Sequence, residues 1–128
     1  MDKEGSWYDG IPLYKHNYEI GKRIRDYEVE NVRRFIDEPR AEGNPVIVAG
    51  DLNDWCGSDC LNTMMGACLK GAWWDGGNGF GWTYFGWGLR LRLDYILYSD
   101  VLELVDVRVI DSDVSDHKPL MTRIEFRD

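Results

Sequence analysis

Three short clusters contain the residue types that could do chemistry. The first is Gly50-Asp51-Leu52-Asn53, which directly follows a run of β-branched residues. Side chains alternate along an extended chain, so Asp51 and Asn53 should point the same way. A carboxylate beside an amide suits a hard cation such as Mg²⁺ together with a phosphate. The alternative is an ordinary turn, which Asp and Asn commonly form after a strand.

The second cluster contains an acidic residue inside an apolar strand pattern, Arg90-Leu91-Arg92-Leu93-Asp94-Tyr95-Ile96-Leu97. Alternation places Asp94 on the same face as Arg90 and Arg92. A carboxylate in the middle of a good strand is unfavourable unless it has a partner. Two partners fit the pattern: Arg92 in a surface ion pair, or a histidine that Asp94 orients for catalysis.

The third cluster is Ser115-Asp116-His117-Lys118-Pro119. Neighbouring side chains of an extended chain face opposite sides, and Pro119 keeps the residue before it extended. Asp116 and His117 are therefore not expected to pair with each other. Asp116 is better placed to contact a metal, directly or through water, and Asp94 is the natural partner for His117 because both lie at sheet termini. A structural or exposed histidine is the alternative.

The elements that must position these clusters follow from periodicity and breakers. Residues 1–16 are expected to be irregular. A helix should begin near Asn17 as N-cap and stop at Pro39, because the residue before a proline is pushed out of the helical region. The run 46–49 has the pattern of a strand buried on both faces, and a short helix is expected at about 59–67.

The remaining chain predicts a loop and three strands. Glycines at 76–81 break regular structure, so residues 73–87 should form a long surface loop with many aromatic side chains. Strands are expected at 89–98, 102–110 and 119–126. A helix followed by such strands predicts an α/β (α+β) fold, with one mostly antiparallel sheet and helices on one face.

Together, in this order and spacing, the three clusters resemble the C-terminal signatures of the endonuclease/exonuclease/phosphatase family of metal-dependent phosphoester hydrolases. Those signatures are a strand ending in Gly-Asp-(Leu/Phe)-Asn, then Arg-(Leu/Ile)-Asp-Tyr-(Ile/Phe)-Leu, then Ser-Asp-His. The resemblance covers roughly residues 19–128. It implies that residues 17–128 form the C-terminal half of a four-layer α/β/β/α sandwich, in which two sheets pack face to face between outer helices.

The resemblance also implies roles for the cluster residues. Asp51 would bind the metal and orient or activate the attacking water, and Asn53 would help to hold the phosphate. His117 would lie near the scissile phosphate, with Asp94 fixing its orientation. Asp116 would lie at the metal side, and the cofactor would be Mg²⁺ or Mn²⁺.

Members of this family also carry an N-terminal half that contains an early Asn and a Glu that is the principal metal ligand. In residues 1–16 only Glu4 is a candidate for that Glu, and His16 falls near the place of a functional histidine but lacks strand context. We therefore expect the site to be incomplete in this chain. The exposed sheet face predicts pairing with an N-terminal half or self-association as a dimer.

Composition limits the substrate only partly. The formal net charge of −8 and the absence of a long basic run disfavour bulk duplex DNA. The family's substrates include nucleic acids, lipid headgroups and small phosphoesters, and all three classes remain open. No apolar run is long enough for a membrane helix, and the compartment is left open. The alternative function is a non-catalytic binding or assembly module derived from the same fold.

Overall fold

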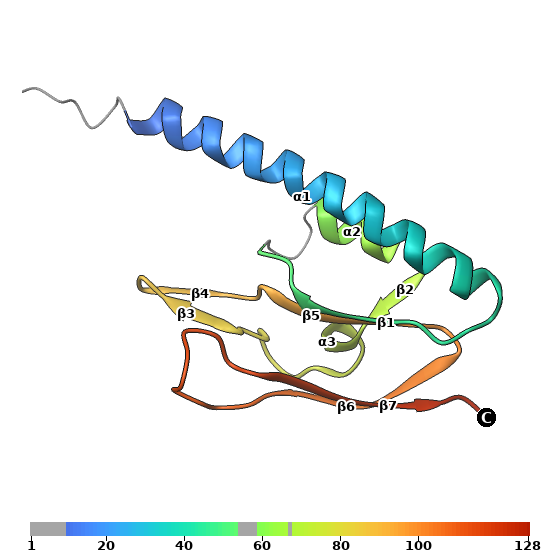
Figure 1. Cartoon of the computed structure of the whole chain (residues 1–128). Coiled ribbons are helices and arrows are strands. Elements are labelled where there is room, and N and C mark those ends of the chain that lie inside the picture. Colours follow the sequence, from blue (N-terminus) through green and yellow to red (C-terminus); the bar gives the residue numbers. More distant parts are fainter. Residues whose placement is uncertain (1–9, 54–58, 67) are drawn as a thin grey trace, which may run out of the picture.

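The computed structural model describes residues 10–53, 59–66 and 68–128. Its elements are α1 (Gly10–Ala41), β1 (Ile47–Asp51), α2 (Asp59–Met65), β2 (Leu69–Gly71), α3 (Ala72–Gly76), β3 (Tyr84–Gly86), β4 (Leu89–Leu91), β5 (Asp94–Ser99), β6 (Leu102–Val109) and β7 (Leu120–Phe126). Helices α1 and α2 cover one face of the β1-β5-β2 sheet, and α3 with the β6–β7 hairpin covers the other (Figure 1). The strand pairs are antiparallel, which confirms the predicted α+β class.

The strands do not form a single sheet. They are divided into β1-β5-β2, β3-β4 and β6-β7. The first two are separate because the strand expected over 89–98 breaks at residues 92–93. At this break the Thr83 hydroxyl accepts hydrogen bonds from the backbone N–H groups of Leu93 and Asp94, both at 3.2 Å. The side chain replaces a strand partner there, so β4 and β5 belong to different sheets.

Strand β5 is the centre of the molecule because both of its faces are packed. Tyr95 and Leu97 face the cluster formed with α1 and α2. Ile96 and Tyr98 face the second cluster, formed with α3 and the β6–β7 hairpin. An unbroken apolar run of this kind is what a strand buried on both faces requires.

Strand β1 differs from its prediction. The strand is present, but it is an edge strand whose only partner among the described residues is β5. Ile47 is therefore 54% exposed, although Val48 packs against the core. The β-branched run predicted the strand correctly, whereas its burial depended on neighbours that sequence periodicity does not specify.

Helix α1 is longer than predicted at both ends. It begins at Gly10 rather than near Asn17, and Pro12 is tolerated because N–H groups of the first turn have no helical acceptor. It continues through Pro39 to Ala41. The stop comes at Gly43, with φ of 79°. The N–H of Gly43 bonds to the Arg40 carbonyl and that of Asn44 to the Pro39 carbonyl, as in a Schellman motif.

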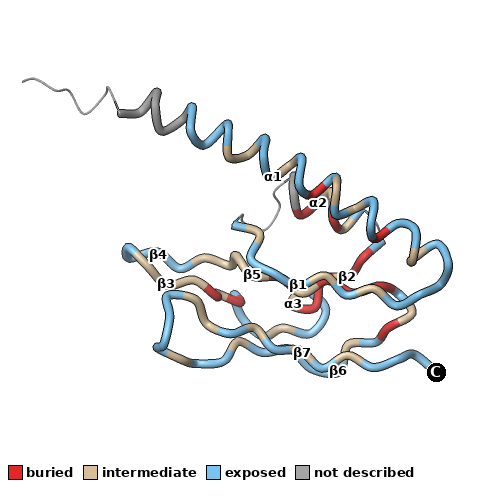
Figure 2. The backbone as a smooth tube through the Cα atoms, viewed as in Figure 1, coloured by how far each residue is buried: buried red, intermediate tan, exposed pale blue. Residues whose placement is uncertain are grey.

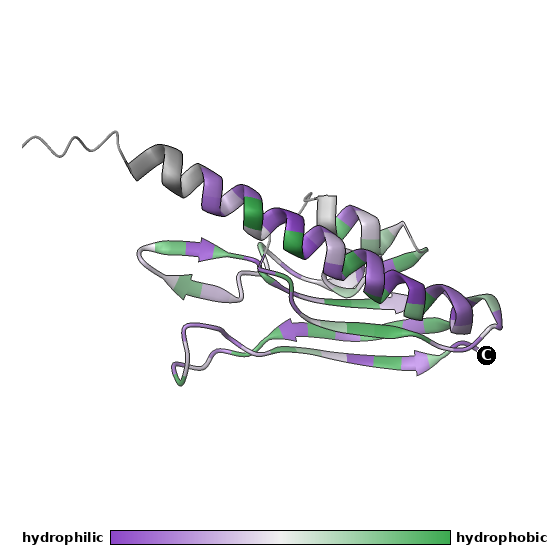
Figure 3. Ribbon diagram, turned by 45° about the horizontal axis from the view of Figure 1, so that its top comes forward, coloured by the Kyte–Doolittle hydropathy of each residue, from purple (hydrophilic) through white to green (hydrophobic). Residues whose placement is uncertain are grey.

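The N-terminal half of α1 extends beyond the sheet (Figure 1), and its residues 16–28 are mostly exposed (Figure 2). Figure 3 shows that hydrophobic and hydrophilic residues alternate along the coloured part of this helix. Its exposed apolar side chains include Tyr18, Ile20, Ile24 and Tyr27. None of the helices in the described ranges has the length and apolar character needed to span a bilayer. Glu4 lies outside the described residues, and His16 is exposed on α1.

The predicted aromatic loop is partly ordered into α3 and a tight hairpin. Strands β3 and β4 pair up to Gly86 and Leu89, so Trp87 and Gly88 form a two-residue turn. Both have positive φ, 54° and 73°, which is the type I′ geometry of such hairpins. A non-glycine residue in this conformation costs roughly 1–2 kcal/mol, and Asn or Gly usually takes the place that Trp87 holds.

Candidate active site

The two carboxylates of the site lie on neighbouring strands. Asp51 ends β1 and Asp94 begins β5, and the two residues are directly opposite each other in the antiparallel register. One carboxylate oxygen of Asp51 accepts the backbone N–H of Asn53 at 2.7 Å, and Asn53 has a φ of 48°. The first cluster thus forms the turn that its residue types allow, and this turn leaves the second oxygen of Asp51 facing His117.

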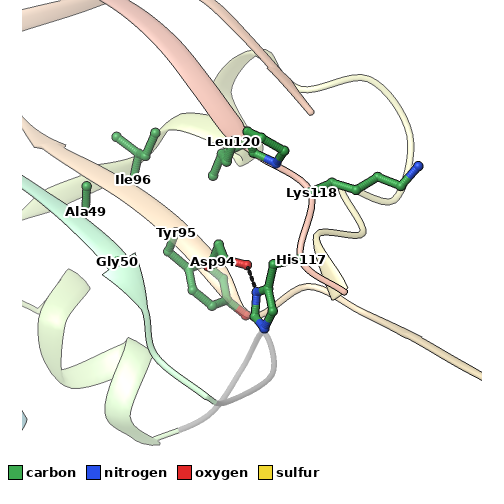
Figure 4. Close-up of a pocket in the computed structure, with 9 residues that line it drawn as sticks. Ala49, Gly50, Asp94, Tyr95, Ile96, His117, Lys118 and Leu120 are labelled. Carbon is green, nitrogen blue, oxygen red and sulfur yellow. Dashed lines mark hydrogen bonds and ion pairs between the residues drawn. The ribbon is translucent and has the colours of Figure 1, made fainter. Parts of the chain in front are cut away.

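His117 lies between these two carboxylates. Its Nδ1 is 2.8 Å from Oδ2 of Asp94 (Figure 4), and its Nε2 is 3.7 Å from Oδ2 of Asp51. Asp94 therefore has the histidine as its partner. No ion pair between Asp94 and Arg92 is present in the described part of the chain; the Arg92 guanidinium instead lies 4.3 Å from the centre of the Trp74 ring.

Two residues that sequence analysis did not single out hold this arrangement. Thr83 is fully buried; its hydroxyl binds the start of β5, and its carbonyl accepts the N–H of Lys118 at 2.6 Å. Thr83 thus ties Asp94 and the His117 segment to one point. The Tyr84 ring contacts His117 edge-on, with centroids 5.3 Å apart. Sequence spacing does not indicate either residue, because the residues that they contact lie far from them in the chain.

The electrostatics of the site favour a charged histidine. The hydrogen bond to Asp94 is the main reason that the pKa of His117 is raised above its ordinary value, and the charges of Asp94, Asp51 and Asp116 act in the same direction, while partial burial opposes them. Each nearby carboxylate stabilises the imidazolium form. Asp94 also fixes which ring nitrogen faces away from it, which leaves Nε2 available on the Asp51 side.

One ligand atom each from Asp51, Asp94 and His117 lies within 4.8 Å of the other two, so this group has the donors for a cation. Oδ2 of Asp94 is already engaged with His117, so the Asp51 carboxylate is the better placed oxygen ligand of the three. A Mg²⁺ site that uses one or two carboxylates plus substrate oxygens fits this donor set.

The structure does not bring Asp116 into this group. Its carboxylate accepts a hydrogen bond from the Ser115 hydroxyl at 3.3 Å, and its carbonyl accepts the N–H of Phe85 at 2.8 Å. Asp116 is exposed. Its backbone, through the bond from Phe85, connects the histidine segment to β3. Asn53 is exposed beside Asp51. The proposed metal role of Asp116 and the phosphate role of Asn53 remain predictions.

A pocket of about 330 Å³ opens beside the His–Asp pair. Its lining includes Gly50, Asp94, His117 and Lys118 (Figure 4). The Lys118 side chain extends away from His117, and its ammonium group pairs with Asp111, which lowers the pKa of that carboxyl. The pocket is large enough for a phosphoester group to approach His117 from the sheet side.

Comparison with known proteins identifies the family. Residues 8–117 match the sequence profile of the Endonuclease/Exonuclease/phosphatase family, and the match includes β1, β5 and His117. Neither the curated proteins nor the solved structures contain a match. Because the family profile covers most of the 128 residues, the chain belongs to the endonuclease/exonuclease/phosphatase family.

Proposed function

We propose that this chain provides the His–Asp half of a divalent-metal-dependent hydrolase of phosphoester bonds. The observation that carries the proposal is the position of His117 between Asp94 and Asp51, in a chain that belongs to a family of phosphoester-cleaving enzymes. A hydrogen-bonded His–carboxylate pair beside a second carboxylate with a free oxygen suits proton transfer next to a cation.

His117 and Asp94 would handle the proton. When Nδ1 donates to Asp94, Nε2 is the atom that can accept a proton or, in the imidazolium form, donate a hydrogen bond to a phosphoryl oxygen. Asp94 is a positioning residue in this scheme because its carboxylate acts through its bond to the histidine. The raised pKa of His117 favours the charged form, which stabilises negative charge that develops on the phosphate.

Asp51 would hold the cation, Mg²⁺ or Mn²⁺, with Asp116 contributing directly or through water. A bound cation supplies positive charge that neutralises the phosphoryl oxygens. Asn53 would contribute its amide to the phosphate, and Asp51 would help to orient the attacking water. Strand β1 has a free edge among the described residues, and we propose that an N-terminal half or a second copy of the chain completes the site there.

The test is hydrolysis of bis(p-nitrophenyl) phosphate and nicking of a plasmid, each with Mg²⁺ or Mn²⁺ and with chelator. His117→Ala should lower the rate by roughly 10²–10⁴-fold, the range for loss of a positioned acid or base. The matched control is His16→Ala, because His16 is exposed on α1 and should leave the rate unchanged.

The alternative proposal is a non-catalytic binding or assembly module. Its supporting observation is that the described trio contains only two carboxylates, and one oxygen of Asp94 is already bonded to His117, so few oxygen ligands are left for a cation. If wild type and His117→Ala have equal rates with either metal, the isolated chain is not an enzyme. Recovery of activity on mixing with an N-terminal half would then separate an incomplete enzyme from a module without chemistry.

A further inference from the structure

The segment between Asp75 and Asp94 differs in charge from the rest of the chain. It contains no Asp or Glu, although the whole chain has 23 such residues and a formal net charge of −8. It does contain Arg90 and Arg92 together with the aromatic residues Phe80, Trp82, Tyr84, Phe85 and Trp87. This combination of cations and aromatic rings without carboxylates complements an anionic partner.

The aromatic rings of this segment form an exposed platform. Phe80 and Trp82 are stacked with centroids 4.8 Å apart and ring planes within 8°, and Phe80 is 75% exposed. The Arg90 guanidinium lies 5.2 Å from the Trp82 ring centre. The outer face of such a ring pair is accessible, and another planar group can stack on it. The neighbouring cation favours a planar group that is part of an anion.

The tip of the β3–β4 hairpin adds a third ring. Trp87 is 96% exposed in a turn position whose positive φ disfavours a bulky residue. The ring contributes nothing to the described core, so neither packing nor turn geometry explains a tryptophan here. A strained and fully exposed aromatic residue is a reason to look for a binding role.

This platform is fixed in place and joined to the active site. The Trp73 indole donates to the Gly79 carbonyl at 3.2 Å, and a Cβ at Gly77 or Gly81 would lie within 2.5 Å of the Trp73 ring, so the loop wraps closely around this side chain. At its other end the segment continues into Tyr84, which contacts His117. The Trp82 ring is therefore two residues along the chain from the side chain that contacts His117.

We infer that Phe80, Trp82 and Trp87 bind unpaired bases of a nucleic-acid strand whose scissile phosphate lies at His117. The inference rests on the proposed hydrolase function and specifies its substrate class. Base faces stack on aromatic rings with little regard to sequence, while the exposed Arg90 supplies charge for the phosphates. The parallel Phe80–Trp82 pair favours a planar base over the flexible acyl chains of a lipid surface.

The experiment measures binding without hydrolysis. Fluorescence anisotropy in chelator compares a labelled single-stranded oligothymidylate with an abasic oligomer of the same length and charge. The wild-type chain should bind the base-containing strand more tightly. Phe80→Ala and Trp87→Ala should each weaken that binding by about 5- to 150-fold, which corresponds to the loss of one base–aromatic stack, with little change for the abasic strand.

Two further variants separate stacking from folding. Trp87→Asn puts a residue that the turn geometry prefers in the same position, so the fold should become more stable while binding falls as it does for Trp87→Ala. Phe126→Ala removes another exposed ring, 72% exposed at the end of β7, and should leave the affinity unchanged.

Equal affinity for the two strands, no binding to either, or unchanged binding in Trp87→Asn would overturn the inference. Preferential binding to phosphatidylglycerol vesicles that depends on Trp87 would assign the surface to lipid instead. If base-dependent binding fails while His117-dependent hydrolysis of bis(p-nitrophenyl) phosphate persists, the substrate class is wrong and the hydrolase function stands. Base-dependent binding without that hydrolysis, even after mixing with an N-terminal half, would support the nucleic-acid surface and contradict the hydrolase function.

Discussion

Strands β1 and β5 are neighbours that each bring a carboxylate to the site, but they are held in different ways. β5 has a strand on either side and a packed cluster on each face, and Leu97 exposes only 1% of its surface. β1 has β5 as its only partner in the described ranges, and most of its residues are exposed.

This difference in packing between β1 and β5 corresponds to two roles in the proposed chemistry, proton handling and cation binding. Asp94 starts the rigid strand, and its bond to His117 is already formed. Asp51 ends the less constrained strand, and its Oδ2 lies 3.7 Å from Nε2 of His117. The proton-handling pair is therefore preorganised, whereas the cation side has room to adjust when a metal, a substrate or a further strand arrives.

The largest expected contrast is in stability. Leu97→Ala should lower the free energy of unfolding by about 2–5 kcal/mol, because it opens a cavity in the core. Ile47→Ala, at a half-exposed position on β1, should cost no more than about 1 kcal/mol. Urea unfolding followed by circular dichroism measures both. Comparable losses would show that β1 is as firmly held as β5.

Cation binding should depend on β1 more than on β5. At a Mg²⁺ concentration 100 times its dissociation constant, the wild-type chain should gain about 2.7 kcal/mol of stability. Asp51→Asn should remove most of this gain, and Asp106→Asn, at an exposed carboxylate on β6, should not. Thermal unfolding with and without Mg²⁺ gives the comparison. A gain that survives Asp51→Asn but is lost in Asp94→Asn would place the cation on β5.

The smallest effect concerns the ionisation of His117. Asp94→Asn should lower the pKa of His117 toward its ordinary value, because the bond to Asp94 is the main cause of the raised pKa. Asp51→Asn should lower it less. NMR titration of the metal-free protein measures both changes. A larger decrease for Asp51→Asn would contradict the geometry in which Asp94 is the direct partner.

The same pKa sets the direction of the pH dependence. A group whose pKa is higher in the folded state stabilises the fold most below its unfolded pKa and loses that contribution as pH rises through its folded pKa. As the pH rises from the ordinary histidine pKa through the higher pKa of folded His117, the wild-type chain should therefore lose a small part of its stability. The stability of Asp94→Asn should change less over the same pH interval. A wild-type stability that rises over this range would oppose the assignment.

Much of the fold was predictable because the relevant signals are local. The β-branched run before Asp51, the apolar run after Asp94 and the valine pattern of β6 predicted strands that the structure confirms. The ends of α1 were predicted wrongly. Pro12 and Pro39 are compatible with the first and last turns, and the stop is a Schellman motif whose hydrogen bonds involve Gly43.

Sequence by itself determined the chemical groups of the candidate site, since residue type and alternation along a strand are local properties. It indicated Asp94 as the natural partner of His117, but the structure alone shows that the 2.8 Å bond forms. Tertiary structure also decided that Thr83 ties the two segments together and that Asp116 stays outside the trio. These results depend on contacts between segments far apart in the chain, and neither periodicity nor spacing encodes such contacts.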